Sequence, residues 1–494
     1  MTSVTATTGL HPKSRRGWNG GSLHDRFEAA TAGAPWTLGY RSLDQDRVSA
    51  IAQVFGRLPK EFGGTLYRNG PARHERNGQR YGHRWDGDGM VQKFVLSDQQ
   101  VTHVGQYVHT EKYLAEAASD RFIANAFGTY LPGTNPVPID IDRANSANIN
   151  VLPFGAELLA LWEAGSAYRL DPDSLETRGL KVWSEETAGK PFSAHPRVEP
   201  DGTLWNFGVD PLRDELTIYH AGSSGRLLRS HTIKVAQLPP THDFAVTERH
   251  LVFLLPPLIL NRERLEAGVS FAEACRWTPS LGMRVLLVDK GDWSQQVFHV
   301  PAGCLFHIAN AWEDMQGVIR VDYMRSADPM SLLAGWSVMG GEYRHFEGAR
   351  LTSLTIDPSK QAAEQRTIGA RESEFPTIEA KDVARRTRRI LCLERSAERP
   401  NDLPGFDEIA LLDVENGASQ TFSYGKDWLV EEHVFAGPAA DAPSRWLLGT
   451  ALDLNAKQTV LSVFDCERLA DGPVAQARLP YALPLGLHGF FQAA

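Results

Sequence analysis

Four histidines in four short phrases are the residues of this chain best suited to bind a metal ion. They are His195 in Ser-Ala-His-Pro, His242 in Thr-His-Asp-Phe, His307 in Phe-His-Ile-Ala-Asn and His488 in Leu-His-Gly. Neutral imidazole is a ligand for iron, zinc, copper and nickel. None of the phrases contains HxH, HxxxH or HExxH, so the usual zinc and metalloprotease motifs are absent.

A shared site would have to join segments that lie 47 to 181 residues apart in the sequence. Only a fold that brings distant strands to a common axis does this easily, and a β-propeller is such a fold. The competing interpretation is that each histidine is a separate, hydrogen-bonded residue of the core.

The rest of the chain is dominated by short apolar segments that are separated by turn residues. Segments of this kind occur at 64–68, 90–96, 158–162, 203–207, 216–219, 285–289, 318–322 and 460–464. Between them lie Asp-Gly, Pro-Asp and Asn-Gly pairs, which favour tight turns between strands. Many short strands without βαβ alternation predict an all-β fold, and at this length a propeller whose repeats have diverged.

Helical periodicity is limited to three stretches. We predict helices over Asp44–Phe55, Leu114–Phe127 and Asn261–Trp277, as insertions that cap one face of the propeller. Residues 1 to 36 are rich in small residues and are expected to form a flexible arm, followed by a single domain over 37 to 494.

Composition excludes several classes of protein. Of the 494 residues 42% are apolar and 22% charged, and the net charge of −9 is spread along the chain, so no nucleic-acid-binding module is indicated. The four cysteines lie far apart and form no CxxC pair, which is typical of free thiols in a reducing cytoplasm. No signal peptide is expected, and the longest apolar run, Leu251–Leu260, is too short to cross a bilayer. We therefore expect a cytoplasmic protein that at most touches a membrane surface.

Other cofactor and catalytic motifs are missing from the sequence. There is no GxGxxG that opens a βαβ unit and no GxxxxGK[ST] loop, so nicotinamide, flavin and ATP are not implied. The phrase Trp85-Asp-Gly-Asp-Gly-Met90 lacks the ligand positions of an EF-hand and is interpreted as a glycine-assisted turn between strands.

Taken in order, the phrases resemble those of the carotenoid cleavage oxygenase family, which also contains stilbene-cleaving oxygenases and a retinoid isomerase. The resemblance covers about residues 40 to 494, and agreement at this many ordered places is highly specific. The matching phrases are Gly64–Pro71, Trp85–Met90, Leu158–Gly165, Ser193–Pro196, His242–Thr247, Phe306–Glu313, Glu374–Pro376 and Leu487–Gly489.

The resemblance implies a seven-bladed propeller with Fe(II) on its axis, bound by His195, His242, His307 and His488. It also implies three glutamates that orient the histidine rings, by motif Glu163, Glu374 and Glu432, although Glu431 stands beside the last of these. Carboxylates at this distance would offset the +2 charge that four neutral imidazoles leave in a dry core. Two positions of an octahedral ion stay open, which suits O2 activation beside an alkene.

The resemblance further implies a non-haem Fe(II) dioxygenase that splits a conjugated C=C bond of a carotenoid or apocarotenoid with O2 into two carbonyl products. Trp162 and Phe306 occupy positions that line the substrate tunnel in the family, though either could be an ordinary core residue. Stilbene cleavers have a phenol-binding lysine at the position of Trp162, and their partner tyrosine would match Tyr130.

Three alternatives remain open at this point. The same site could cleave a stilbene or phenylpropene, or isomerise a retinoid without O2. A more distant alternative is a non-catalytic propeller that binds a protein partner.

The apolar segment Leu251–Leu260 and the residues after it, through Trp277, form either a membrane-contacting patch at the tunnel mouth or a buried strand and capping helix.

Overall fold

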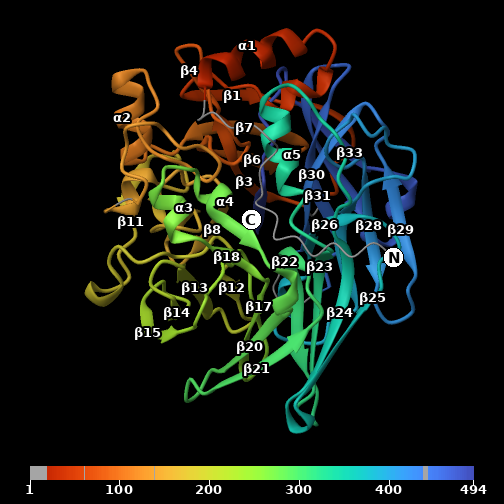
Figure 1. Cartoon of the computed structure of the whole chain (residues 1–494). Helices are drawn as coiled ribbons and strands as arrows, with labels where there is room; N and C mark the ends of the chain where they lie inside the picture. Colours follow the sequence, from red (N-terminus) through yellow and green to blue (C-terminus); the bar gives the residue numbers. More distant parts are fainter. Residues whose placement is uncertain (1–18, 61, 138, 438–442) are drawn as a thin grey trace.

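Seven antiparallel sheets surround a common axis in this protein. The computed structural model describes residues 19–60, 62–137, 139–437 and 443–494. Each sheet has four or five strands, and together they form a seven-bladed β-propeller, which confirms the expected fold class (Figure 1). The blades are numbered in chain order from the one that contains β3.

Apart from β34, the strands of blades 1 to 4 come from residues 47–300. Blade 1 contains β1 (Arg47–Ile51), β7 (Gln100–Tyr107), β6 (Asp88–Ser97), β3 (Gly64–Arg73) and β34 (His488–Ala493). Blade 2 contains β11 (Thr177–Leu180), β10 (Tyr168–Leu170), β9 (Glu157–Leu161) and β8 (Asn150–Phe154). Blade 3 contains β12 (Arg197–Val198), β13 (Leu204–Asp210), β14 (Glu215–Ala221) and β15 (Leu227–Lys234), and blade 4 contains β16 (Ala245–Val246), β17 (His250–Leu255), β20 (Met283–Asp289) and β21 (Gln295–Val300).

Blades 5 to 7 complete the ring. Blade 5 contains β22 (Cys304–Glu313), β23 (Ile319–Ser326), β24 (Arg350–Asp357) and β25 (Ala362–Thr367), and blade 6 contains β26 (Ser373–Thr377), β27 (Arg389–Glu394), β28 (Glu408–Asp413) and β29 (Ser419–Ser423). Blade 7 contains β30 (Trp428–Ala436), β31 (Trp446–Asp453), β32 (Gln458–Asp465), β33 (Ala475–Arg478) and β2 (Gln53–Gly56). Two hairpins stand apart, β4 (Glu75–Arg76) with β5 (Gln79–Arg80), and β18 (Leu258–Leu260) with β19 (Cys275–Trp277).

The innermost strands are β34, β8, β12, β16, β22, β26 and β30, and most of them contact their counterpart in the next blade. Two strands close the ring by pairing with strands from the opposite end of the chain. β34 pairs with β3, so that His488 stands opposite Asn69, and β2 pairs with β33, so that Gln53 stands opposite Arg478. Both the first and the last blade therefore contain a strand from the other end of the described chain.

The hydrophobic core is divided among the spaces between neighbouring blades. Leu254 of blade 4 and Leu354 of blade 5, for example, belong to one buried cluster. The central strands have neighbours on both faces, and they read as nearly continuous apolar runs such as His-Leu-Val-Phe-Leu-Leu in β17. The apolar run Leu251–Leu260 thus forms most of the buried strand β17 and all of β18, the strand that pairs with β19, and it is not an exposed patch.

The helix predicted over Asp44–Phe55 is wrong, because most of these residues form the strands β1 and β2. β1 is the outer strand of blade 1, where it pairs with β7, and β2 pairs with β33 of blade 7. Pairing with strands that are distant in sequence overrode the local pattern, which is common for edge strands.

The other two predicted helices are shorter than expected. α2 (Glu111–Ser119) begins after the N-cap Thr110 and ends because Asp120 adopts a left-handed conformation, with φ of 48°. The stretch Asn261–Trp277 is divided into α3 (Arg262–Glu266), α4 (Phe271–Ala274) and strand β19. Gly268, with φ of 84°, separates the two short helices.

The expected flexible arm contains a helix. α1 (Gly20–Ala30) starts at Asn19, whose side chain accepts a hydrogen bond from the Ser22 backbone N–H. It is held in place by Phe27, which is fully buried under the Arg80 guanidinium. The predicted arm covers residues 1 to 36, and its first 18 residues lie outside the described part of the chain.

Helices and one hairpin cover one end of the axis, as the prediction of a cap required. α5 (Leu332–Met339), α4 and the β18–β19 hairpin pack in a single apolar cluster with Trp85 and Phe306 (Figure 1). Short 3-10 helices occupy Pro35–Tyr40, Ile141–Ala144, Glu185–Thr187, Pro279–Leu281, Pro358–Lys360, Ala380–Asp382 and Cys466–Asp471. Within the described part of the chain, no helix is long and apolar enough to span a bilayer.

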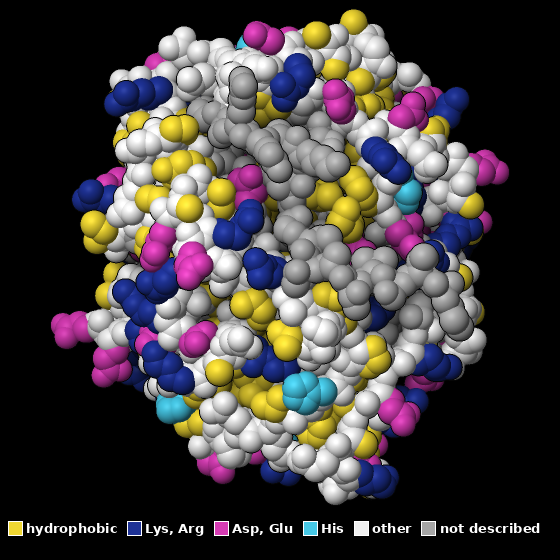
Figure 2. Space-filling view, in the orientation of Figure 1, with side chains coloured by type: hydrophobic (Ala, Val, Ile, Leu, Met, Phe, Trp, Pro, Cys, Tyr) yellow, Lys and Arg dark blue, Asp and Glu magenta, His cyan; other side chains and the backbone are white. Residues whose placement is uncertain are grey.

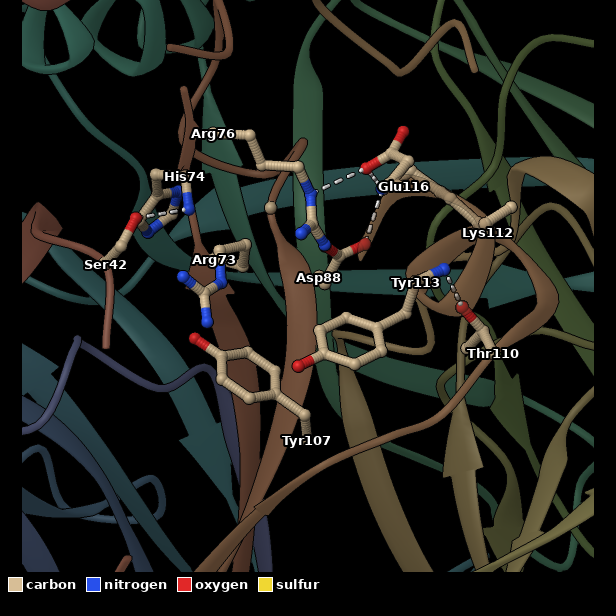
Figure 3. A network of polar contacts seen from close by, with 12 residues as sticks. Ser42, Arg73, His74, Arg76, Asp88, Tyr107, Thr110, Lys112, Tyr113 and Glu116 are labelled. Atoms are coloured by element: carbon tan, nitrogen blue, oxygen red, sulfur yellow. Dashed lines mark hydrogen bonds and ion pairs between the residues drawn. The ribbon is translucent and has the colours of Figure 1, made fainter. Parts of the chain in front are cut away.

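Charged side chains of both signs are interspersed over the described part of the face in Figure 2, in keeping with the charge pattern of the sequence. A further set of charges is buried beside the cap, where α2 meets blade 1 (Figure 3). Asp88 of β6 accepts from Lys112 of α2 at 2.5 Å and from Arg76 of β4 at 3.0 Å. Glu116 of α2 approaches the same two cations at 3.3 and 3.4 Å. Two cations and two carboxylates thus join α2 to β6, the strand that begins within the Trp85–Met90 phrase.

Candidate metal centre and substrate cavity

The four histidines meet at the axis because each lies on or just before an innermost strand. His195 precedes β12, His242 precedes β16, His307 lies within β22 and His488 is the first residue of β34. One ligand atom from each of the four lies within 4.8 Å of the others. Strands from blades 3, 4, 5 and 1 thus bring together residues that are far apart in the sequence.

The geometry of the rings fits a shared cation. The Nε2 atoms of His195 and His242 are 2.9 Å apart, and those of His307 and His488 are 3.1 Å apart. Two unprotonated imidazole nitrogens this close repel each other unless a proton or a cation lies between their lone pairs. Four such nitrogens around one point form a set that a transition-metal ion would satisfy.

Three of the four rings are fixed from behind by carboxylates. Nδ1 of His242 donates to Glu163 at 2.5 Å, Nδ1 of His307 donates to Glu374 at 2.5 Å, and Nδ1 of His488 donates to Glu432 at 2.8 Å. A proton on Nδ1 leaves the Nε2 lone pair free, and the carboxylate makes that nitrogen a better electron donor. All three predicted glutamates therefore stand where they orient a histidine.

The structure distinguishes Glu432 from its neighbour Glu431. Besides His488, Glu432 accepts a hydrogen bond from the Gly489 backbone N–H at 2.7 Å. Glu431 points elsewhere, accepting from the Gly486 backbone N–H at 2.5 Å and lying 3.6 Å from the buried Arg68 guanidinium. Glu432 is thus the carboxylate that contacts a histidine of the cluster, and Glu431 supports the backbone before His488.

His195 differs from the other three, because no carboxylate pairs with it among the described residues. Burial, together with the three neighbouring histidines, holds the pKa of His195 well below its usual value. Burial also lowers the pKa of His242, but the neighbouring carboxylates, Glu163 foremost, together outweigh it, and the net shift of that pKa is upward. The cluster therefore combines one imidazole that lacks a carboxylate partner in the described part of the chain with three that carboxylates polarise.

Irregular strand pairing aims these residues at the axis. The pairing of β22 shifts register between Leu305 and Ile308, around His307. The pairing of β26 shifts after Glu374, and that of β30 shifts between Val430 and His433, around Glu432. A bulge redirects side chains that regular alternation would send to opposite faces, and bulges are frequent beside active sites.

Two cavities meet at the level of the histidines. On β22, Cys304, Leu305 and Phe306 line one cavity of about 240 Å³, whereas Ile308 and Ala309 line another of about 570 Å³. The same division holds on β34, where Leu487 lines the first cavity and the residues after His488 line the second. The first cavity, called here the cap cavity, lies on the side of the cap helices, and the second follows the inner strands along the axis.

Aromatic side chains form much of the wall of the cap cavity. Both predicted tunnel residues are among them: Trp162 lines it beside Glu163, and Phe306 lies edge-on to His242 with ring centroids 5.9 Å apart. Trp85 stands edge-on to Phe306 at 5.2 Å. A flat, conjugated molecule fits a wall of this kind, because ring faces and edges both attract π-systems.

Tyr130, the third predicted substrate residue, is not part of this wall. Its hydroxyl donates to the Thr134 carbonyl at 3.4 Å, and its ring packs against Gly268 in the loop between α3 and α4. The short turn Thr129–Thr134 curls the tyrosine back on its own loop, and the structure therefore does not bring Tyr130 together with Trp162.

Sequence reasoning missed Phe375, which lies 5.2 Å from both His307 and His488 between ring centroids. Its backbone is left-handed, with φ of 54°, and its N–H donates to Glu374 at 2.9 Å. An unusual backbone of this kind is often found at functional sites. The Glu-Phe-Pro phrase held the signal, although only its glutamate had been given a role.

Comparisons with known proteins agree with this geometry. The family model described as retinal pigment epithelial membrane protein matches residues 41–493. The apocarotenoid-15,15'-oxygenase of Synechocystis is 29% identical over 92% of this chain and 95% of its own length, and the isoeugenol monooxygenase of Pseudomonas putida is 26% identical over 89% and 94%. The solved structure of cobalt-substituted Synechocystis apocarotenoid oxygenase superposes with a TM-score of 0.85 at 27% identity, covering 93% of this chain and 98% of that one.

The family match spans nearly the whole described chain, and the relatives are named oxygenases. The chain therefore belongs to the retinal pigment epithelial membrane protein family, that of the carotenoid cleavage oxygenases, and is an enzyme of oxidative alkene cleavage.

Proposed function

We propose that the protein is a non-haem Fe(II) dioxygenase that cleaves one conjugated C=C bond of a carotenoid or apocarotenoid. One alkene and one O2 would give two carbonyl products, and both oxygen atoms would be retained in them. The observation that carries this proposal is the convergence of four imidazole Nε2 atoms, three of them fixed by carboxylates, at the inner end of an aromatic cavity.

The residues present fit Fe(II) better than the other divalent ions that prefer oxygen or sulfur. Imidazole nitrogen suits iron, whereas magnesium and calcium prefer oxygen ligands. His195, His242, His307 and His488 would hold the ion, and the three carboxylates would offset its charge. When bound, Fe(II) would supply the open coordination positions at which O2 is activated next to an alkene.

The protein's own contribution is positioning. Trp162, Phe306 and Phe375 would hold the polyene against the histidine cluster, because their rings line the cap cavity next to it. An apolar wall also excludes water from the reacting carbons. No side chain needs to transfer a proton, since the overall reaction neither releases nor consumes one.

An apocarotenoid fits this site better than a stilbene. Trp162 stands where the lysine of stilbene cleavers would bind a phenol, and Tyr130 turns away from the cap cavity. The Synechocystis relative is named for an apocarotenoid, and its match covers more of both chains than that of the isoeugenol monooxygenase. These observations support a long, mainly apolar substrate.

A substrate panel tests the proposal directly. Protein loaded anaerobically with Fe(II) would be mixed with air-saturated buffer and, separately, apo-8'-carotenal, resveratrol, isoeugenol or a retinyl ester, and O2 uptake and product masses would be measured. We expect O2 uptake and two carbonyl products with the apocarotenoid. Faster cleavage of the phenolic alkenes would reverse the substrate assignment, and isomerisation without an aldehyde, or no O2 uptake with any compound, would refute the dioxygenase.

A further inference from the structure

The cap cavity contains a single strongly basic side chain among its described lining residues, that of Arg84. The residue directly precedes Trp85, and its backbone N–H donates to the Gly335 carbonyl of α5 at 3.1 Å. Arg84 is therefore anchored between the turn before β6 and the cap. The remaining wall is mainly aromatic and aliphatic, so the charged guanidinium lies in largely apolar surroundings.

A series of rings connects Arg84 with the histidine cluster. The Arg84 guanidinium carbon lies 5.2 Å from the Trp85 ring, Trp85 contacts Phe306, and Phe306 contacts His242. Each step leads along the wall of the same cavity. Arg84 thus lies at one end of the cap cavity, and the rings of Trp85 and Phe306 separate it from the histidine cluster.

The charge of Arg84 has no counter-ion in the described part of the structure. Its Nε atom is buried without a hydrogen-bond partner, and no ion pair involves its guanidinium. Its contact with Trp85 is worth about 0.5–1 kcal/mol at a partly exposed site, which does not replace a carboxylate. A guanidinium is charged at every working pH, so a molecule that displaces water from the cavity leaves this charge without a partner unless it brings one.

Neighbouring polar groups do not provide that partner. His83 is neutral, because burial and the nearby Arg84 charge lower its pKa to about 3. Its Nε2 faces the Leu332 carbonyl at 3.2 Å, and its Nδ1 accepts from the Trp85 backbone N–H. Glu372, the acid that lines this part of the cavity, already pairs with His345, whose Nε2 atom lies 3.1 Å from a Glu372 carboxylate oxygen.

We propose that Arg84 is an anion-binding subsite that receives the terminal carboxylate of a conjugated polyene. This inference rests on the proposed function and adds the polar end of the substrate to it. Tyr343 also lines the cap cavity, so its hydroxyl is a second polar group on the same wall. A carboxylate held at Arg84 would set how far along the chain the cleaved double bond lies, because the rings between Arg84 and His242 fix that distance.

Binding of a fluorescent polyene tests the subsite without turnover. The iron-loaded enzyme would be titrated anaerobically with cis-parinaric acid, a conjugated tetraene carboxylic acid, and with its methyl ester. We expect the acid to bind about 10-fold to 100-fold more tightly than the ester, as a charge-assisted hydrogen bond allows. Arg84→Leu would bind both with similar affinity, and Arg84→Lys would restore part of the preference for the acid.

Arg344→Leu is the matched control, because Arg344 is exposed nearby but does not line the cap cavity. It removes the same charge and should keep the full preference for the acid. Equal affinity of the wild type for acid and ester, or an equal loss of preference in both leucine variants, would overturn the subsite. Cleavage of neutral polyenes by the wild type is measured separately, and its absence would count against the proposed function and not against Arg84.

Discussion

At the scale of single residues, the centre depends on the distinction between carboxylates that touch a histidine and carboxylates that do not. Glu163, Glu374 and Glu432 each hold one Nδ1, whereas Glu431 supports the chain before His488 from the neighbouring position. Position in the sequence does not separate the last two. The directions of the Glu431 and Glu432 side chains separate the two residues, because adjacent side chains at a bulge in β30 point to different places.

The first prediction compares two neutralising variants of that pair. Glu432→Gln should lower the Fe(II) affinity of the protein by about 10-fold to 100-fold, since partners of metal-bound histidines typically contribute that much. Glu431→Gln should leave the affinity within a few fold. Iron content after dialysis against a graded series of chelator concentrations measures both. Equal losses in the two variants would contradict the assignment of Glu432.

A second prediction concerns the wall of the cap cavity. Trp162→Lys supplies the cation that stilbene cleavers carry at this position, and we expect it to lower kcat/KM for apo-8'-carotenal by about 10-fold or more, because a charge is buried beside the polyene. Iron content should stay unchanged, which separates the effect from damage to the centre. Unchanged kinetics with the apocarotenal would show that Trp162 does not contact the substrate.

At the scale of elements, the strands and the presence of a cap were largely predictable, but the bounds of the helices were not. Apolar runs such as 285–289 and 460–464 are buried on both faces and lie within β20 and β32. Asp44–Phe55 was misread because β1 and β2 are edge strands, and their conformation depends on β7 and β33, whose paired residues lie at least 51 positions away in the sequence. The bulges that aim His307, Glu374 and Glu432 left no sequence signal, and the resemblance alone identified those residues.

The third prediction tests the buried charges that attach α2 to blade 1 (Figure 3). Lys112 is fully buried between Asp88 and Glu116, so Lys112→Met leaves two carboxylates facing the single cation Arg76. We expect the free energy of unfolding to fall by about 3–5 kcal/mol, as for other broken buried ion pairs. Urea denaturation of the metal-free protein measures it.

Lys234→Met provides the control for that measurement. Lys234 pairs with Glu215 on the surface, with the lysine side chain 68% exposed, and exposed pairs contribute at most about 1 kcal/mol. A similar loss in both lysine variants would mean that burial of the charges around α2 does not determine their contribution.

At the scale of the whole molecule, ring closure and assembly of the centre are the same event. β34 closes blade 1 by pairing with β3, and its first residue is His488. Glu432, which fixes His488, comes from blade 7 on the other side of the junction. Metal binding should therefore stabilise the ring, because it links blades 1, 3, 4 and 5 through one point.

The fourth prediction distinguishes the role of β34 in closing the ring of blades from the role of His488 as a metal ligand. His488→Ala should lose stoichiometric iron but keep the fold, with a loss in Tm of several degrees at most relative to the metal-free wild type. Deletion of residues 488–494 should also remove the strand that pairs with β3 and unfold blade 1. Calorimetry with and without Fe(II) distinguishes the variants. A folded, iron-binding deletion variant would refute the role of β34.

The position of His488 also has a consequence for biosynthesis. His195, His242 and His307 are made early, and the fourth histidine of the cluster comes 181 positions after His307. At a synthesis rate of about 5–20 residues per second, that interval lasts roughly 10–40 s. A ribosome-bound chain thus exposes an incomplete set of three imidazoles while blades 6 and 7 are still being made. Binding of a metal ion by all four histidines must therefore wait until translation has passed residue 488.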